Sequence, residues 1–161
     1  MAIIVATGTD WAYIAGLLDS GGHIGLSNSF SPRIHIAIYR TVQEGNPLPE
    51  LCKVTGVGHV YPAETPAGRS GKAWEIHKQD DIELFLNRVT PYLKIKRSQA
   101  FLMLLFVQVH KEQRPSQERK ELDEQIYNLI REYNRGSSDR VMGRELFFGS
   151  RDPLSDTPYF H

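Results

Sequence analysis

Residues 14–26 read IAGLLDSGGHIGL, and this stretch decides the predicted fold. Its first half carries apolar residues at helical spacing, and the pair Gly21-Gly22 that follows is typical of a helix end. After the glycines the pattern changes to the alternation of a strand. We therefore expect a helix over residues 11–20 with Asp10 as its N-cap, followed directly by a strand.

The predicted helix has an unusual residue at its centre. A glycine such as Gly16 costs a helix about 1 kcal/mol relative to alanine, but it lets another backbone come close. Ala12, Ala15, Gly16 and Asp19 lie at i, i+3, i+4 and i+7, on one stripe that we expect to lie opposite the core face. The stripe favours packing against a second helix across an interface. The alternative is a core helix with an incidental glycine.

The rest of the sequence predicts a mixed fold. Hydrophobic periodicity and turn signals indicate two strands joined by SNSFSPR, a helix over 48–54, a third strand after TGVGHVY, a fourth strand over 72–78, and helices over 82–89, 97–111 and 117–133. This order predicts an α+β protein in which a single antiparallel sheet is backed by helices. We expect one domain over residues 1–161, with a core over about 11–140 and a tail over 141–161.

Composition limits the classes of function. The 161 residues include 19 basic and 19 acidic side chains, so only a local basic patch, not bulk charge, could attract nucleic acid. A single cysteine, Cys52, excludes an internal disulfide framework. The most apolar stretch, residues 100–109, is too short to cross a bilayer, and the N-terminus lacks the features of a signal peptide. We expect an intracellular protein in a reducing compartment, either a bacterial cytoplasm or an organelle matrix.

One face of the predicted sheet carries small and hydrogen-bonding side chains. If the isoleucines of the second strand face the helices, the other face holds Ser27, Ser29, Arg33, His35, Ala37, Tyr39, Tyr61, Ala73, Glu75 and His77, with Arg69 and Lys72 near the loop. Such a face could lie in a DNA major groove and contact base edges. The alternative is an ordinary solvated sheet face.

Five segments together resemble one known family. IAGLLDSGGHI (14–24) resembles the signature of the LAGLIDADG homing endonucleases. The segments RIHIAIYRTVQ, VTGVGHVY, VTPYLKIKRSQA and NRGSSDR follow in the order and at the spacing of the single-motif members of that family. The resemblance extends from about Trp11 to Arg140.

The resemblance implies a fold, a partner and a reaction. The fold would be the αββαββα endonuclease core, and one motif per chain implies a homodimer with the two motif helices packed at its two-fold axis. Each four-stranded sheet would lie in the major groove of a long, pseudo-palindromic DNA site. The reaction would be the Mg²⁺-dependent phosphodiester hydrolysis of an intron-encoded endonuclease. Neither a membrane nor a small-molecule substrate is implied.

The motif departs from the family at the metal-binding acid. That acid directly precedes the final glycine of the motif, and Gly21 stands there. Asp19 matches an earlier acid and lies about 200° away around the helix, so its carboxylate cannot replace one at position 21. Mg²⁺ requires oxygen ligands, and Gly21 offers only its backbone carbonyl. The chain is therefore expected to bind DNA but to cut it poorly or not at all. Gly21 and Gly22 also read as a plain helix end, and both interpretations can hold together.

Other positions acquire roles by the same resemblance. Lys96 matches the active-site lysine, which would stabilise charge on the scissile phosphate; the alternative is a solvated surface lysine. Arg40 matches a residue that positions the nucleophilic water, whereas Glu44 stands where the family often has a basic residue. Ser137 and Arg140 match contacts to the DNA backbone.

Three functions remain open on the sequence. The first is a homodimeric, sequence-specific DNA-binding protein of the homing endonuclease class, with cleavage impaired by Gly21. The second is a non-catalytic relative, either a DNA-binding regulator or an RNA splicing cofactor (maturase). The third is a module that binds protein with its sheet face. The six histidines show no zinc-ligand spacing.

Overall fold

A four-stranded antiparallel sheet organises the part of the chain that the structure describes. The computed structural model describes residues 6–112 and 114–135. The strands are β1 (Gly22–Leu26), β2 (Pro32–Ile38), β3 (His59–Glu64) and β4 (Ser70–Ile76), in the order β1-β2-β4-β3. The predicted α+β class and the predicted sheet are both confirmed.

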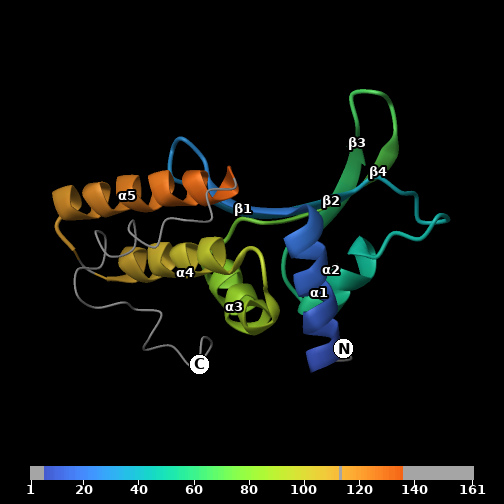
Figure 1. Ribbon diagram of the computed structural model, residues 1–161, viewed down its shortest axis with the longest axis horizontal. Coiled ribbons are helices and arrows are strands. Elements are labelled where there is room, and N and C mark those ends of the chain that lie inside the picture. Colours follow the sequence, from blue (N-terminus) through green and yellow to red (C-terminus); the bar gives the residue numbers. More distant parts are fainter. Residues whose placement is uncertain (1–5, 113, 136–161) are drawn as a thin grey trace.

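The helices follow the predicted order with small changes at their ends. They are α1 (Gly8–Gly21), α2 (Leu48–Thr55), α3 (Gln79–Val89), α4 (Arg97–Lys111) and α5 (Ser116–Asn134), with a 3₁₀ turn, η1 (Thr90–Tyr92), between α3 and α4. In Figure 1, α1 to α4 lie on one side of the sheet, and the β3–β4 hairpin extends away from them. The α4 bounds agree with the predicted 97–111.

The start of α1 differs from the prediction. Thr7, not Asp10, is the N-cap, and its hydroxyl accepts from the Asp10 backbone N–H at 3.2 Å. The Asp10 carboxylate in turn accepts from the Thr7 backbone N–H at 2.8 Å. This reciprocal pair is a capping box, so Asp10 acts from the third helical position rather than from the cap.

The end of α1 explains one of the two paired glycines. Gly22 is the C-cap with extended backbone, φ −90° and ψ 173°, and its N–H donates to the Leu18 carbonyl. A Cβ at Gly22 would lie 2.4 Å from Leu18 Cδ1, so glycine is needed there because the chain passes close to its own helix. A Cβ at Gly21 would meet nothing within 4 Å. The usual left-handed glycine cap does not occur at either residue.

The core lies between the inner face of the sheet and the helices. Ile34, Ile36, Trp74 and Ile76 face the helices and are at most 1% exposed. Phe85 of α3 packs against Trp74, with ring centroids 5.1 Å apart. The alternation predicted for these two strands is therefore confirmed for their core-facing residues.

The edge strand β1 is covered by α5. Asn134, at the end of α5, donates its side-chain amide to the Ile24 carbonyl at 3.0 Å. Tyr127 donates its hydroxyl to Asn28 in the β1–β2 turn at 2.6 Å. These contacts protect an edge that would otherwise be open to pairing with another strand. Among the described helices, none combines the length and the apolar character needed to span a membrane.

Candidate nucleic-acid interface

The sheet surface that faces away from α1 to α4, here called the outer face, carries a row of titratable side chains. His23 of β1 is opposite His35 of β2, His35 is opposite Glu75 of β4, and Glu75 is opposite His59 of β3. His77 directly follows β4, and its ring stacks on His59 with centroids 6.1 Å apart. Because opposed residues share a face, the four strands hold these groups in one transverse line.

Glu75 is the centre of this line. Arg33 donates to one carboxylate oxygen, Tyr61 donates its hydroxyl to the same oxygen at 2.5 Å, and His77 Nε2 lies 2.8 Å from the other oxygen. The Glu75 side chain is 10% exposed. Burial alone would raise its pKa, but hydrogen bonds from Tyr61, His77 and Arg33 and the Arg33 charge lower the pKa from 4.5 to about 2. The Glu75 carboxylate therefore accepts hydrogen bonds within the protein and orients Arg33, Tyr61 and His77.

Because of the hydrogen bonds to Glu75, part of the free energy of unfolding depends on pH. A carboxylate with a lowered pKa stabilises the folded state above its unfolded pKa of 4.5, and this contribution is lost as the pH falls towards about 2. In urea unfolding, the stability advantage of the unmodified chain over Glu75→Gln should shrink by about 3 kcal/mol across this window. A gap between the two proteins that stays constant with pH would show that Glu75 is not held as a carboxylate.

Most of the predicted outer-face residues lie on that face, but not all of them are accessible. Arg33, His35 and Ala37 alternate outward along β2 as predicted. Ala73 lies on the outer face as predicted, but it is only 1% exposed and offers little surface there. Lys72 lies near the β3–β4 loop as predicted, on the side of β4 that Trp74 and Ile76 share.

Four further predicted residues lie outside the strands. Ser27 and Ser29 are exposed in the β1–β2 turn, where the turn signal SNSFSPR placed them, and their hydroxyls are 2.9 Å apart. They therefore lie beyond the end of β1 rather than on the sheet face where they were also expected. The turn is closed by the backbone bond from Phe30 to Ser27. Tyr39 follows β2 and is 37% exposed, and Arg69 lies in the β3–β4 loop.

The interpretation of the sequence missed His23 and His59. Both lie on the outer face through their pairing with His35 and Glu75. The signal was present in the alternation, since His23 precedes Gly25 by two residues. Gly25 also gives the ring room, because a Cβ there would lie 2.5 Å from His23 Nε2.

A second group of predicted residues meets at the end of α1. The Asp19 carboxylate accepts backbone N–H groups from Lys94 at 2.8 Å, Ile95 at 3.2 Å and Lys96 at 2.9 Å. The Lys96 ammonium donates to the Asp19 backbone carbonyl at 3.2 Å. Lys96 is thus held beside the end of the motif helix, at Asp19, which precedes Gly21 by two residues.

These contacts change the interpretation of Asp19. Both of its carboxylate oxygens bind the backbone at residues 94–96, which makes Asp19 a clamp between α1 and the segment before α4. Within residues 6–112 and 114–135, no group of three or more His, Cys, Asp or Glu side chains could hold a metal ion. The structure therefore does not support Asp19 as a metal ligand.

Arg40 lies in the loop between β2 and α2. Its guanidinium donates to the Glu44 backbone carbonyl, with Nη2 at 2.7 Å and Nε at 3.2 Å. Asn46 fastens the same loop by donating to the carbonyls of Ile38 and Arg40. The loop therefore positions Arg40 through main-chain contacts, which do not depend on the acidic side chain of Glu44.

The small-residue stripe of α1 is only partly exposed. Ala12 and Gly16 are exposed, and a Cβ at Gly16 would meet no atom within 4 Å. Ala15, however, is completely buried, so its predicted place opposite the core is wrong. The Asp19 carboxylate accepts the backbone N–H groups of residues 94–96. Tyr13, which is 57% exposed, lies beside Ala12 and Gly16 on the exposed middle part of the helix.

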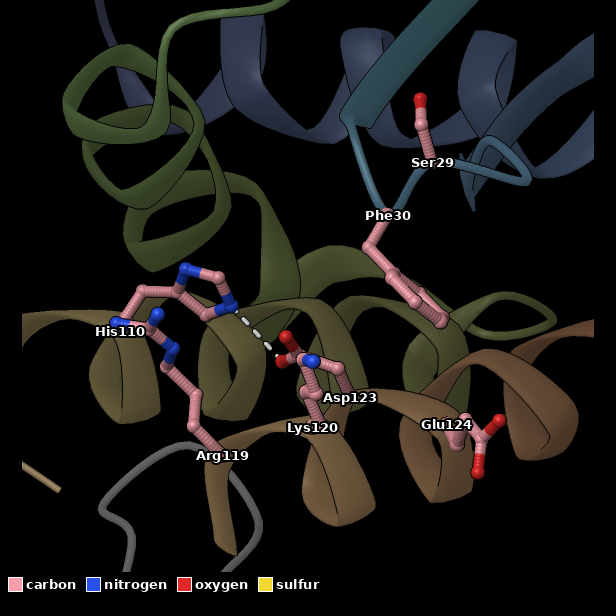
Figure 2. A pocket seen from close by; sticks show the side chains of 7 residues that line it. All are labelled: Ser29, Phe30, His110, Arg119, Lys120, Asp123 and Glu124. Atoms are coloured by element: carbon pink, nitrogen blue, oxygen red, sulfur yellow. Dashed lines mark hydrogen bonds and ion pairs between the residues drawn. The ribbon is translucent and has the colours of Figure 1, made fainter. Parts of the chain in front are cut away.

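A pocket of about 350 Å³ lies away from both groups, between the β1–β2 turn and helices α4 and α5. Figure 2 shows Phe30 pointing towards the helices and Ser29 pointing away from them. His110 of α4 lies 2.8 Å from the buried Asp123 of α5, and its ring packs on Phe106 with centroids 4.1 Å apart. This pair joins the two helices, and Ser29 is not oriented to act with it.

Two predicted backbone contacts cannot be placed. Ser137 and Arg140 lie outside the described residues. Their assignment to the DNA backbone stays a prediction.

The comparisons with known proteins concern the fold. No family model and no curated protein matches the sequence. The homing endonuclease I-CvuI, solved with a target DNA in the presence of 2 mM Mg with the DNA not cleaved, is 17% identical, with a TM-score of 0.58 over 79% of this chain and 85% of that chain. The archaeal intron-encoded homing endonuclease I-Vdi141I, complexed with DNA, is 14% identical, with a TM-score of 0.53 over 80% of this chain and 98% of that chain.

A third structure carries the family's descriptive name. The LAGLIDADG meganuclease I-CpaMI, bound to uncleaved DNA, is 17% identical, with a TM-score of 0.50 over 63% of this chain and 36% of that chain. These matches agree with the element order and the sheet described above. The chain therefore has the LAGLIDADG homing endonuclease fold.

Proposed function

We propose that this chain is a sequence-specific, duplex-DNA-binding protein of the homing endonuclease class that acts as a homodimer and cleaves poorly because of Gly21. The observation that carries the proposal is the outer face, where Arg33, the imidazoles and Tyr61 form a fixed set of polar groups on one side of a four-stranded sheet. Side chains of these kinds contact base edges in the major groove. The matching fold supports this use, because the solved relatives are complexes with DNA.

The net charge of the chain is zero, but the outer face has its one carboxylate enclosed by hydrogen-bond donors. Glu75, the one acidic residue of the outer-face row, is enclosed by Arg33, Tyr61 and His77, and its side chain is only 10% exposed. DNA laid on this face would therefore approach donors before it approached a carboxylate. A basic or neutral patch of this kind is what a protein with zero net charge needs to bind phosphate-rich duplex.

The residues present do not fit a magnesium site. Gly21 supplies no side chain, and the Asp19 carboxylate is engaged by three backbone N–H groups. Mg²⁺ is usually held by one or two carboxylates together with phosphate oxygens and water. Lys96, held beside the end of α1, is the one predicted active-site group whose placement suits contact with a scissile phosphate. Binding with little or no cleavage is therefore the proposed activity.

The proposed dimer uses the exposed surface of α1. Gly16→Leu should lower the dimer fraction in analytical ultracentrifugation, because a large side chain would separate the two motif helices. The monomer should tolerate it, since a Cβ at Gly16 meets no atom within 4 Å. Gln125→Leu, at an exposed position of α5, is the matched control and should leave association unchanged. A Gly16→Leu protein that dimerises as before would contradict this interface.

The function itself is tested by binding. A duplex selected from a randomised pool should bind the dimer tightly, and the affinity should fall as salt rises because phosphate contacts release counterions. Structured intron RNA and random duplex should bind more weakly. Tight binding of RNA alone would favour a splicing cofactor, and binding of neither nucleic acid would favour a protein-interaction module.

A further inference from the structure

Four of the six histidines of the chain gather on the outer face. His23 and His35 are opposed on β1 and β2, while His59 and His77 stack on the far side of Glu75. We call these four residues the imidazole set. His110 lies elsewhere, in its pair with Asp123. The imidazole set therefore concentrates on one surface most of the groups that change charge near neutral pH.

The hydrogen-bonding character of this surface is set by Glu75. Its two oxygens already receive Arg33, Tyr61 and His77, so the acceptor is used within the protein. Arg33 can only donate, and a protonated imidazole donates from both ring nitrogens. With its imidazoles protonated, the outer face thus presents donors, and it fits a partner edge rich in acceptors.

In the free protein, the surroundings of His23 and His35 oppose protonation of these two rings. For His23, burial, the Arg33 charge and the Lys96 charge all lower the pKa. For His35, burial and the charges of Arg33 and His23 lower the pKa, against an opposing effect of Glu75. In the free protein these surroundings favour the neutral form of both rings. DNA phosphates close to the face would favour the charged form and draw protons in.

We propose that the opposed pair His23 and His35 of the imidazole set is a proton-dependent reader of guanine, which takes up protons as the outer face enters the major groove. The inference rests on the proposed DNA-binding function and adds its preferred base and its dependence on pH. Guanine is the base that shows two acceptors, N7 and O6, side by side in the major groove. Adenine and cytosine each show an amino donor there, which a donor-only surface cannot satisfy.

The test measures affinity for a duplex selected by the unmodified chain at about pH 6, in EDTA so that no metal contributes. Between about pH 6 and about pH 8 the affinity should fall about tenfold or more, because net uptake of one proton changes it up to tenfold per pH unit. The double variant His23→Asn, His35→Asn should lose most of this dependence. Neither ring takes part in the hydrogen bonds that hold Glu75, so the double variant should fold, which circular dichroism will check.

Two controls identify the site and the base. His110→Gln, off the outer face, should keep the pH dependence of the unmodified chain. The same duplex carrying 7-deazaguanine, which lacks the N7 acceptor, should bind about tenfold more weakly near pH 6 and nearly normally near pH 8. Tight binding that does not change with pH would overturn the inference. So would pH dependence that persists in the folded double variant, or 7-deazaguanine that has no effect. Failure to bind any duplex at any pH would instead refute the proposed function itself.

Discussion

If the proposed function holds, Gly21→Asp is expected to make a chain that binds DNA with little cleavage produce double-strand breaks. The position accepts a side chain, because it is exposed and a Cβ there meets no atom within 4 Å. In the proposed dimer the change would supply one carboxylate per subunit at the helix end that Lys96 contacts, and so an oxygen site for Mg²⁺. Metal ions contribute several kcal/mol to such reactions, so we expect cleavage of a plasmid that carries the selected site to rise roughly a hundredfold or more.

The controls separate the charge from the size of the new side chain. Gly21→Asn is nearly the same shape without the negative charge, and it should stay inactive. Adding Lys96→Ala to Gly21→Asp should reduce cutting again, because the phosphate would lose its nearby ammonium. If the unmodified chain already cuts at the rate of Gly21→Asp, the role assigned to position 21 is wrong. If Gly21→Asp binds tightly but does not cut, a purely binding role becomes the better account.

Asp19→Ala is expected to loosen the junction between α1 and the segment before α4. The carboxylate accepts three backbone N–H groups, and hydrogen bonds to a charged acceptor stabilise more than neutral ones. Their partial exposure and the unfavourable position of an acid at a helix C-terminus reduce the effect to about 2 kcal/mol. Urea unfolding should show this loss. Asp19→Asn, which keeps one acceptor oxygen, should lose less, and equal stability of Asp19→Ala and the unmodified chain would contradict the clamp.

Strong local patterns predicted the elements well. The helix over 97–111 is strongly apolar and is flanked by residues that break helices, so the pattern defines where it begins and ends. Its predicted bounds are confirmed. Alternation placed Arg33 and His35 on the correct side of β2, because a period of two assigns each residue to one of two faces. Element order then followed, and with it the α+β class.

Predictions that depended on distant partners did less well. Helical spacing grouped Ala15 with Gly16, but adjacent residues are 100° apart, so the boundary between the buried and exposed faces fell between them. Asp19 forms its bonds with residues 75 to 77 positions later, which no local pattern contains. The accessibility of Ala73 was likewise set by neighbouring strands, and alternation alone cannot reveal that.

Photo-cross-linking from three positions tests the central claim that the outer face binds DNA. A benzophenone side chain would replace Tyr39 beside the outer face, Tyr13 on α1 or Leu84 on α3, all of which are exposed. With the selected duplex present, position 39 should give a protein–DNA adduct and position 13 a cross-linked dimer. Position 84, on a helix that lies on the other side of the sheet from the outer face (Figure 1), should give neither. A DNA adduct from position 84 with none from position 39 would contradict the account.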